Sequence, residues 1–573
     1  MRNSAIIRIR IITSLVLLLA SVLVVRLYFL QVVYSHEFVE RANQQYVHTA
    51  QNIFNRGSIY FTTKSGELVS AAAVRSGFVL AVNPQRVTDA VSYYEKLAPF
   101  ISTSAEEFIA RSTLENRTYV EIESRITNEE AEHIAELGLS GVMLYRNRWR
   151  HYPGESLSAQ TIGFVAESDD PNEFVRGRYG LERFYDDILA REHRSLSVNI
   201  FAGIFANLGS MITATADTTQ RGHVVTTLEP TVSRMLDVTL LDINDRYQSS
   251  HTGGIIMDPN TGAVIAMSAV PAYNNNNRRG VSVEQFRNPL VENVYEFGSI
   301  MKAVTIAAGI DAGAITPQTQ FYDTGSVVLD RFTIRNFDGR GRGQVDMQRV
   351  LNDSLNTGVS FIVDQMGTSA FRDYLYNLQF NQRSGIDLPN DTRGLTSNLE
   401  SPRKVEYATA SFGQGVAVTP MTMIKTLSAL ANGGNVVTPH LVQEVIYENQ
   451  TRRNVSPEII PGVLKPQTSE QISRMLTNVV DTALRGGGLA LPNHTVGAKT
   501  GTAQIPNPQT GGYYDNRFLH SFFGYFPAYD PQFIVLLYTV DPQGVRYASE
   551  TLTDSFMDIT SFLINYYEIP PDR

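Results

Sequence analysis

The stretch TGGIIMDPNTGAVIAMSAV (residues 252–270) predicts two apolar strands joined by a tight turn, because Asp, Pro, Asn and Gly in its middle favour chain reversal. A second strand–turn–strand pattern, SFFGYFPAY (521–529) and FIVLLYTVD (533–541), lies near the C-terminus. Many helix-like segments separate the two patterns. We therefore expect an α+β fold in which both ends of residues 251–573 share one antiparallel sheet.

The segments outside this pair of patterns are also predictable in outline. Residues 549–567 carry apolar side chains at helical spacing and predict an amphipathic helix. Upstream, two short strands are expected at 56–61 and 66–73, and two surface helices at 106–115 and 127–137. The Asn-rich run at 274–277 and the Gly-rich run at 339–343 predict loops, and the second lacks the strand-to-helix context of a phosphate site.

The composition excludes several classes of site. The chain has 573 residues, no Cys, and 48 basic against 57 acidic side chains, a net charge of −9. Without cysteine there can be no disulfide scaffold, zinc-thiolate site, iron–sulfur cluster or thiol nucleophile. The ten histidines are scattered without an HExxH motif, so we expect no metal and no cofactor. The acidic balance argues against nucleic acid as a partner.

The N-terminus predicts a membrane anchor. Residues 11–25 are uncharged and mostly apolar, and the apolar character resumes after Arg26 as far as residue 33. As a helix, residues 11–33 would be about 34 Å long, enough to cross a bilayer. Three arginines and no acid lie within residues 1–10. We therefore expect a single-pass protein of the cytoplasmic membrane, with a cytoplasmic tail and an extracytoplasmic body. The alternative is a cleaved signal peptide.

One segment pairs a serine with a lysine. FGSIMKAVTIAAGI (297–310) places Ser299 and Lys302 three residues apart at the start of a predicted helix, so both side chains share one face. A serine hydroxyl is a poor nucleophile and needs a base. A lysine in a dry pocket beside another cation loses its proton more easily and can act as that base.

Two further motifs follow in a fixed order. Ser354-Leu-Asn356 comes 55 residues after Ser299, and Lys499-Thr-Gly501 comes 145 residues after Ser354, on a predicted apolar strand with small residues. Each motif is common alone. The ordered trio is the signature set of serine enzymes that are acylated by a D-alanyl peptide or a β-lactam.

The sequence resembles a class B penicillin-binding protein, a monofunctional peptidoglycan D,D-transpeptidase. The resemblance covers nearly the whole chain and implies an elongated mixed pedestal domain at 34–250. It also implies a transpeptidase domain at 251–573, of the penicillin-binding/β-lactamase-like fold, with a central antiparallel sheet flanked by helices. One departure is the turn at 62–66, where the family has Asp-Arg-Asn-Gly. The segments that carry the resemblance are 56–59, HYPGESLSAQTIGFV (151–165), GRYGLERFYDDILA (177–190), EFGSIMKAVT (296–305), FGQGVAVTPMTM (412–423), ALANGG (429–434) and AKTGTAQ (498–504).

The resemblance implies a role for each catalytic side chain. Ser299 would attack the carbonyl between the last two D-alanines of a stem peptide, and Lys302 would take its proton. Ser354 would pass a proton toward the leaving amine. Asn356 would hydrogen-bond the substrate amide, and Lys499 would supply positive potential near Ser354.

The resemblance also implies a substrate-binding strand. The hydroxyls of Thr500 and Thr502 would bind the terminal carboxylate. The backbone N–H groups of Ser299 and Thr502 would form the oxyanion hole. Gly501 would be required because a side chain there would block the substrate backbone.

The sequence is also compatible with other functions. A β-lactamase is disfavoured because no Glu-x-x-Leu-Asn stretch is present to position a deacylating water, and a D,D-carboxypeptidase because of the long pedestal. A β-lactam-sensing receptor or a scaffold of the wall-synthesis complex is the non-enzymatic alternative. As partners, the resemblance implies peptidoglycan stem peptides, β-lactams, and wall-synthesis membrane proteins including a SEDS-type glycosyltransferase, in cell elongation or division.

Overall fold

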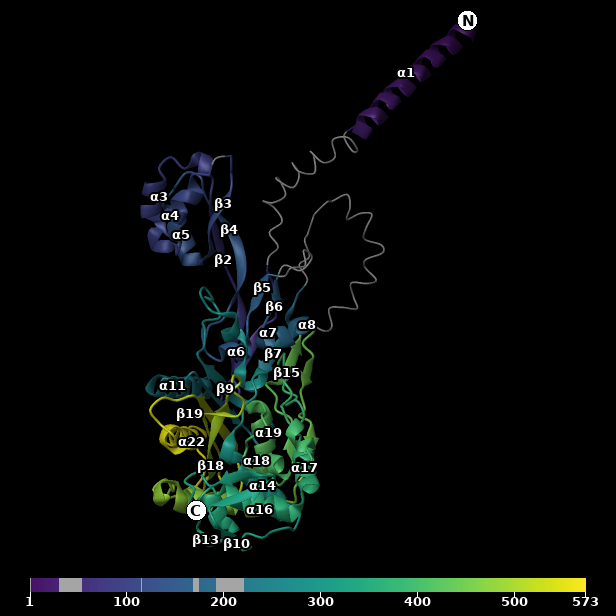
Figure 1. Cartoon of the computed structure of the whole chain (residues 1–573). Helices are drawn as coiled ribbons and strands as arrows, with labels where there is room; N and C mark the ends of the chain where they lie inside the picture. Colours follow the sequence, from purple (N-terminus) through teal and green to yellow (C-terminus); the bar gives the residue numbers. More distant parts are fainter. Residues whose placement is uncertain (1, 30–53, 115, 168–174, 192–220) are drawn as a thin grey trace. The chain divides into compact units, whose positions relative to one another are not determined.

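The computed structural model of the protein (Figure 1) describes residues 2–29, 54–114, 116–167, 175–191 and 221–573. The chain divides into two compact units. The smaller comprises Met1–Asn55, Arg75–Trp149 and Glu192–Thr215, and the larger comprises Arg56–Val74, Arg150–Arg191 and Ala216–Arg573. The domain limits expected from the sequence, at 33/34 and 250/251, stay predictions.

The larger unit is built on a five-stranded antiparallel sheet, which confirms the expected α+β arrangement. Its strand order is β18-β19-β20-β8-β9, so strands from both ends of the C-terminal half lie in one sheet. Both predicted strand–turn–strand patterns and the predicted Lys-Thr-Gly strand are present. The strands are β8 (His251–Met257), β9 (Val264–Val270), β18 (Gly497–Pro506), β19 (Tyr513–Phe526) and β20 (Phe533–Val540).

Successive side chains of this sheet point to opposite faces, as the two-residue period of a strand requires. Ile256 and Phe522 lie in one core with α11 (Pro230–Tyr247) and α22 (Thr553–Tyr567). The stacked rings of Phe522 and Phe556, with centroids 4.4 Å apart, join α22 to this face. Each such fully buried side chain contributes about 1.5–3 kcal/mol. The helix expected at 549–567 is thus largely α22, preceded by the short α21 (Ala548–Thr551).

The other face of the sheet carries the helical layer that presents the candidate site. The immediate neighbours Ile255 and Phe523 belong to this second core. It also contains buried side chains of α14 (Met301–Asp311), α16 (Asn356–Met366), α18 (Lys404–Ser411), α19 (Pro420–Ala431) and α20 (Pro466–Asn478). Because α14 is buried on nearly all sides, its position relative to β18 is fixed by packing.

The smaller unit has a core of its own, in which Leu80, Phe108 and Ile122 are buried. Both predicted surface helices are confirmed. The second, α5, begins with a capping box between Thr127 and Glu130. Its other elements are the C-terminal part of β2 (Leu68–Val82), α3 (Ala90–Leu97), α4 (Ala105–Ser112), β3 (Val120–Ile126), α5 (Asn128–Glu136) and the first part of β4 (Val142–His151).

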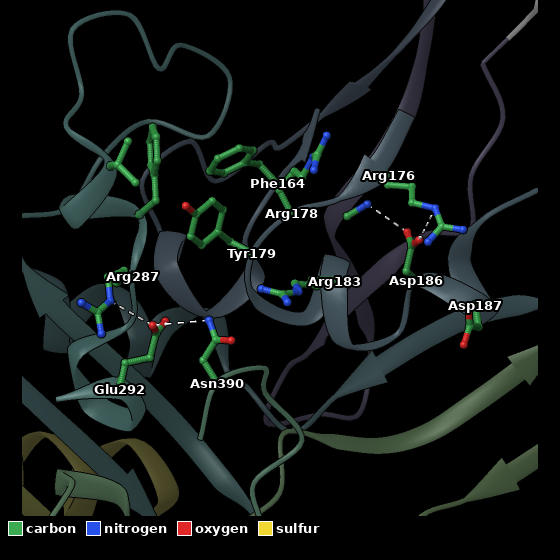
Figure 2. Close-up of a pocket in the computed structure, with 13 residues that line it drawn as sticks. Phe164, Arg176, Arg178, Tyr179, Arg183, Asp186, Asp187, Arg287, Glu292 and Asn390 are labelled. Carbon is green, nitrogen blue, oxygen red and sulfur yellow. Dashed lines mark hydrogen bonds and ion pairs between the residues drawn. The ribbon is translucent and has the colours of Figure 1, made fainter. Parts of the chain in front are cut away.

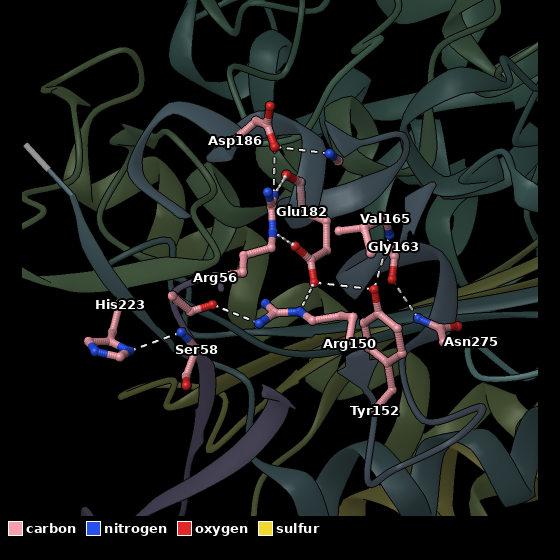
Figure 3. A network of polar contacts seen from close by, with 12 residues as sticks. Arg56, Ser58, Arg150, Tyr152, Gly163, Val165, Glu182, Asp186, His223 and Asn275 are labelled. Atoms are coloured by element: carbon pink, nitrogen blue, oxygen red, sulfur yellow. Dashed lines mark hydrogen bonds and ion pairs between the residues drawn. The ribbon is translucent and has the colours of Figure 1, made fainter. Parts of the chain in front are cut away.

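A buried ionic network joins three sequence motifs of the larger unit (Figure 3). The carboxylate of Glu182 accepts hydrogen bonds from Nε of Arg56 at 2.7 Å, from Nε of Arg150 at 2.5 Å and from the Tyr152 hydroxyl at 3.2 Å. A second carboxylate, Asp186, pairs with Arg56 at 2.7 Å. Burial alone would raise the pKa of Glu182, but Arg150 and Arg56 together hold it below its ordinary value. The three motif segments are therefore tied together by charge.

The turn at 62–66, which departs from the family pattern, makes a contact of its own. It joins β1 (Ile59–Thr62) to β2, as the sequence predicts. Lys64 donates from Nζ to the carbonyl of Tyr566 at 2.6 Å and to Glu568 at 2.8 Å. The altered turn is thereby attached to the end of α22.

The N-terminal helix α1 spans Arg2–Tyr28. Within the described part of the chain, no helix combines the length and the apolarity of a membrane span. The anchor expected at residues 11–33 extends past residue 29 and so lies partly outside the described residues; it stays a prediction.

Candidate active site

Ser299 lies in the single 3-10 turn Gly298–Ile300 that leads into α14, as the sequence predicts. This turn is held against β18. Gly298 has φ +64°, and a Cβ there would lie 2.7 Å from the carbonyl oxygen of Thr502, so only glycine fits. Its N–H donates to the carbonyl of Gly413 at 3.1 Å. The nucleophile candidate is thus fixed between the edge strand and the 412–415 turn.

Lys302 lies one turn further along α14 and is 1% exposed. Its Nζ donates to the Ser354 carbonyl at 2.5 Å and to the Ser354 hydroxyl at 3.0 Å. Burial, and then the positive charge of Lys499, lower the pKa of Lys302 well below its ordinary value. A neutral amine at this position can accept the proton of a serine hydroxyl, as a general base must.

Lys499 also donates to the Ser354 hydroxyl. Its Nζ, on β18, donates to the Ser354 hydroxyl at 3.2 Å and to the carbonyl of Thr500 at 3.1 Å. It is 3% exposed, and burial lowers its pKa to about 8. Ser354 itself has φ +55°, a left-handed conformation that non-glycine residues rarely adopt. The hydroxyl of Ser354 therefore contacts the amines of two buried lysines.

Asn356 begins α16 and lines the cleft that also contains Ser299 and Lys302. Its Nδ2 donates to the carbonyl of Arg335 at 2.8 Å. With the amide nitrogen engaged in this way, Oδ1 remains as an acceptor for a substrate N–H.

Thr500 and Thr502 line the cleft from β18, the edge strand of the sheet, while Gly501 between them faces the interior. The Thr502 hydroxyl accepts a hydrogen bond from the N–H of Ala548 at 3.1 Å, so its proton is available to donate to a ligand. The structure gives a different reason for Gly501 from the one expected. A Cβ there would lie 2.3 Å from Oγ of Ser521 and 2.5 Å from the carbonyl of Phe297, inside the protein.

One cleft of about 1150 Å³ brings the three motifs together. It lies within the larger unit. Of the predicted site residues, only Gly501 is absent from its lining; those that line it are Ser299, Lys302, Ser354, Asn356, Lys499, Thr500 and Thr502. Among the described residues there is no cluster of three or more His, Cys, Asp or Glu side chains that could hold a metal ion.

A second cavity, of about 870 Å³, has a different chemistry (Figure 2). Its wall is formed by Phe164, Tyr179 and Phe286, which contact one another ring to ring. The acid Glu292 pairs with Arg287 at 3.1 Å and accepts from Asn390 at 3.4 Å. No serine, lysine or histidine is among the described residues that line this cavity. It therefore lacks the serine–lysine pair that the predicted acyl transfer needs.

A buried network that the sequence does not predict supports Asn356. The carboxylate of Asp323, which is 1% exposed, accepts from the Thr357 hydroxyl at 2.7 Å, from Nδ2 of Asn336 at 2.9 Å and from the N–H of Arg342 at 2.9 Å. Asp323 ends β10 (Gln320–Asp323), and Thr357 follows Asn356 on α16. No local pattern distinguishes Asp323 from any other acid before a turn.

Two other missed residues lie behind Ser299. Ser521 on β19 donates to the carbonyl of Phe297 at 2.7 Å. Gly413 has φ +79°, and a Cβ added to it would lie 2.3 Å from the carbonyl oxygen of Gly298. The FGQG motif could have signalled Gly413, whereas Ser521 is one small residue in an apolar strand and carries no signal.

Comparisons with known proteins show which family the chain belongs to. The family model for the penicillin binding protein transpeptidase domain matches residues 252–560, and the model for the penicillin-binding protein dimerisation domain matches residues 54–199. The chain is 29% identical over 506 residues to stage V sporulation protein D of Bacillus subtilis, covering 84% of this chain and 75% of that protein. It is 24% identical to the probable peptidoglycan D,D-transpeptidase PenA of Neisseria gonorrhoeae, covering 96% and 91%.

Solved structures show the same fold. Penicillin binding protein 2X from Streptococcus thermophilus aligns with a TM-score of 0.71 at 19% identity, covering 91% of this chain and 81% of that one. A peptidoglycan synthetase from Bifidobacterium adolescentis aligns with a TM-score of 0.66 at 18% identity, covering 91% and 96%. With a family model that spans more than half of its length and the three motifs assembled in one cleft, this chain belongs to the penicillin-binding protein transpeptidase family.

Proposed function

We propose that the protein is a peptidoglycan D,D-transpeptidase that crosslinks stem peptides through an acyl-enzyme on Ser299. The observation that carries this proposal is the position of the Ser354 hydroxyl, 3.0 Å from Nζ of Lys302 and 3.2 Å from Nζ of Lys499, in the cleft that Ser299 lines. The proposal is also supported by relatives that are named as D,D-transpeptidases.

In the acylation step, the neutral amine of Lys302 takes the proton of Ser299 Oγ as the oxygen attacks the carbonyl between the two terminal D-alanines. The N–H groups of Ser299 and Thr502 hold the oxyanion of the tetrahedral intermediate, and each such donor contributes roughly 3–4 kcal/mol. The C–N bond then breaks. The proton returns through the Ser354 hydroxyl to the leaving nitrogen, and D-alanine departs.

Three sets of side chains bind the donor peptide in this step. The hydroxyls of Thr500 and Thr502 donate to the terminal carboxylate of the donor peptide. Lys499 supplies positive potential close to that carboxylate and to Ser354. The free Oδ1 of Asn356 accepts from the substrate amide.

In the second step, the amine of a neighbouring stem peptide attacks the ester carbonyl of the acyl-enzyme. The amine loses a proton to the same base, a new amide bond forms, and Ser299 leaves with its proton restored. No oxidant, metal or cofactor enters this balance.

We also propose that residues 11–33 anchor the protein in the cytoplasmic membrane, with residues 1–10 in the cytoplasm and the catalytic cleft outside. This is supported by the uncharged run and by the arginines that precede it. The apolar side chains of α1 in the described range are also largely exposed, at 66% for Leu18 and 67% for Val24, and require an apolar surrounding. The anchor and the pedestal would contact a SEDS-type glycosyltransferase that supplies the glycan strands, the partner that the family resemblance implies.

Incubating the full-length chain, in detergent, with a pentapeptide donor ending in D-Ala-D-Ala and an amine acceptor tests the proposed activity. We expect free D-alanine and a crosslinked product by liquid chromatography–mass spectrometry, and neither product from Ser299→Ala. Release of D-alanine with a hydrolysed donor but no crosslink would instead identify a D,D-carboxypeptidase. Binding of the donor without turnover would favour a sensor or a scaffold.

A further inference from the structure

The candidate active-site cleft is lined by more basic than acidic side chains, although the whole chain is acidic. Its lining has only two acids, Asp353 and Glu550. Its seven basic residues are Lys302, Arg335, Arg342, Arg349, Arg485, Lys499 and Arg546. A cleft with such a balance raises the local concentration of anionic ligands.

Most of these cations are already accounted for. Arg349 pairs with Asp353 at 2.7 Å, and Arg342 pairs with the same carboxylate at 3.4 Å. Arg485 pairs with Asp554 at 2.5 Å. The two lysines belong to the catalytic arrangement around Ser354.

Two arginines remain, Arg335 and Arg546. Both side chains are exposed, and neither guanidinium forms an ion pair with any residue that the structure describes. The nearby carboxylate of Glu550 is engaged elsewhere, because it accepts from the N–H of Tyr547 at 3.0 Å and from the backbone N–H of Arg546 at 3.3 Å.

A pair of aromatic rings places both arginines on one part of the cleft wall. The rings of Phe337 and Tyr547 meet edge to face, with centroids 5.9 Å apart, although the two residues come from different segments of the wall. The guanidinium carbon of Arg546 lies 5.7 Å from the Tyr547 ring. Arg335 lies two residues before Phe337, and its carbonyl accepts the hydrogen bond from Asn356. The two segments that carry these arginines therefore lie on the same part of the cleft wall, and one of them contacts Asn356.

We propose that Arg335 and Arg546 bind a second carboxylate of the donor stem peptide, carried by the residue that precedes D-Ala-D-Ala. The inference rests on the proposed function. The terminal carboxylate is already provided for by Thr500, Thr502 and Lys499, so the two arginines without an ion-pair partner among the described residues are available for a further anion. Guanidinium groups suit this task because they present paired N–H donors that match a carboxylate. The enzyme then prefers donors with a free carboxylate at this residue over donors in which it is amidated.

The test uses two synthetic N-acyl tripeptides ending in D-Ala-D-Ala, which differ only in a side-chain carboxylate or carboxamide on the first residue. Their rates of acylation of the full-length protein are measured by competition with a fluorescent penicillin. We expect the carboxylate peptide to react roughly tenfold faster. This preference should shrink as salt rises from low to physiological concentration and above, because both arginines are exposed.

Variants of the two arginines test whether these residues, and not the overall charge of the protein, cause the preference for the carboxylate peptide. In Arg335→Ala and in Arg546→Ala the preference should fall by about threefold each, and the double variant should lose it. The matched control is Arg474→Ala, which removes an exposed arginine of α20 outside the cleft lining and should keep the full preference. Charge-preserving Arg335→Lys should retain part of it.

Penicillin labelling distinguishes the two levels of the account. If wild type is labelled but both tripeptides react equally, or if the double alanine variant keeps the preference, the inference about Arg335 and Arg546 is overturned and the proposed function stands. If the wild-type protein is not labelled at all, both the proposed function and the inference about the two arginines are overturned.

Discussion

The amine of Lys302 and the hydroxyl of Ser354 form a 3.0 Å hydrogen bond that joins two motifs 52 residues apart. The bond matters because Lys302 is fully buried and has a pKa well below its ordinary value. Lys499 reaches the same hydroxyl from β18 at 3.2 Å. A serine hydroxyl that contacts two such amines can accept or donate a proton, which is what an acylation and its reversal require.

The pH dependence of acylation should report the base. The rate constant for acylation by a penicillin should rise with pH as Lys302 loses its proton and then level off, with an apparent pKa well below 10.4. Lys302→Arg should be at least about 100-fold slower at pH 7, because a guanidinium stays protonated. Stopped-flow measurements between pH 6 and 9 give both results. A variant that keeps the wild-type rate would contradict the role assigned to Lys302.

The same lysine should make stability depend on pH. Its folded pKa lies below the unfolded value, so the unfolded state binds more protons and the wild type gains stability as pH rises. The gain is at most about 1.4 kcal/mol per pH unit and ends near pH 10.4. Lys302→Met lacks this contribution. Between pH 6 and 9, the free energy of unfolding in urea should therefore rise more for the wild type than for the variant. If the difference between the two free energies stays constant with pH, the pKa of Lys302 is not lowered in the folded state.

Gly501→Ala should damage both stability and labelling. The new Cβ would strike Ser521 and the carbonyl of Phe297, two residues before Ser299. Overpacking of this kind costs about 1–3 kcal/mol. The control is Gly488→Ala, where the nearest atom outside its immediate neighbours would be 3.4 Å away. In chemical unfolding, Gly501→Ala should be less stable than Gly488→Ala, and it should be labelled more slowly by a penicillin. Equal stability and equal labelling of the two variants would argue against the close contact.

Glu182→Gln should strongly destabilise the larger unit. The substitution leaves the guanidiniums of Arg56 and Arg150 buried without their shared carboxylate, which costs about 3–5 kcal/mol. The control is Glu470→Gln, because Glu470 forms an exposed pair with Arg474 and should change stability by less than about 1 kcal/mol. The ionised form of Glu182 is favoured in the folded state, so its contribution is present above the unfolded pKa and is lost as pH falls through the lowered folded value.

The sequence predicts the parts of the fold that depend on local pattern. The strand–turn–strand segments at 252–270 and 521–541 can be predicted because turn residues interrupt their apolar runs. The prediction that both segments share one sheet follows from them. Ser299 at the start of a helix is readable for the same reason. Such features need only a few neighbouring residues.

The remaining features depend on contacts between distant segments. The Asn-rich run at 274–277 is a loop, but Asn275 is 1% exposed and donates to the carbonyl of Gly163 at 2.6 Å. Likewise, Asp323 meets Thr357 across 34 residues. No local periodicity marks either partner, because the pairing exists only once the sheet and helices have packed.

The most direct test of the central claim is where a penicillin attaches. The full-length protein and its Ser299→Ala variant are incubated with a penicillin, and intact-mass and peptide mass spectrometry locate the adduct. The account predicts one adduct per chain, on the peptide that contains Ser299, and none on the variant. An adduct on another residue, or equal labelling of both proteins, would contradict it.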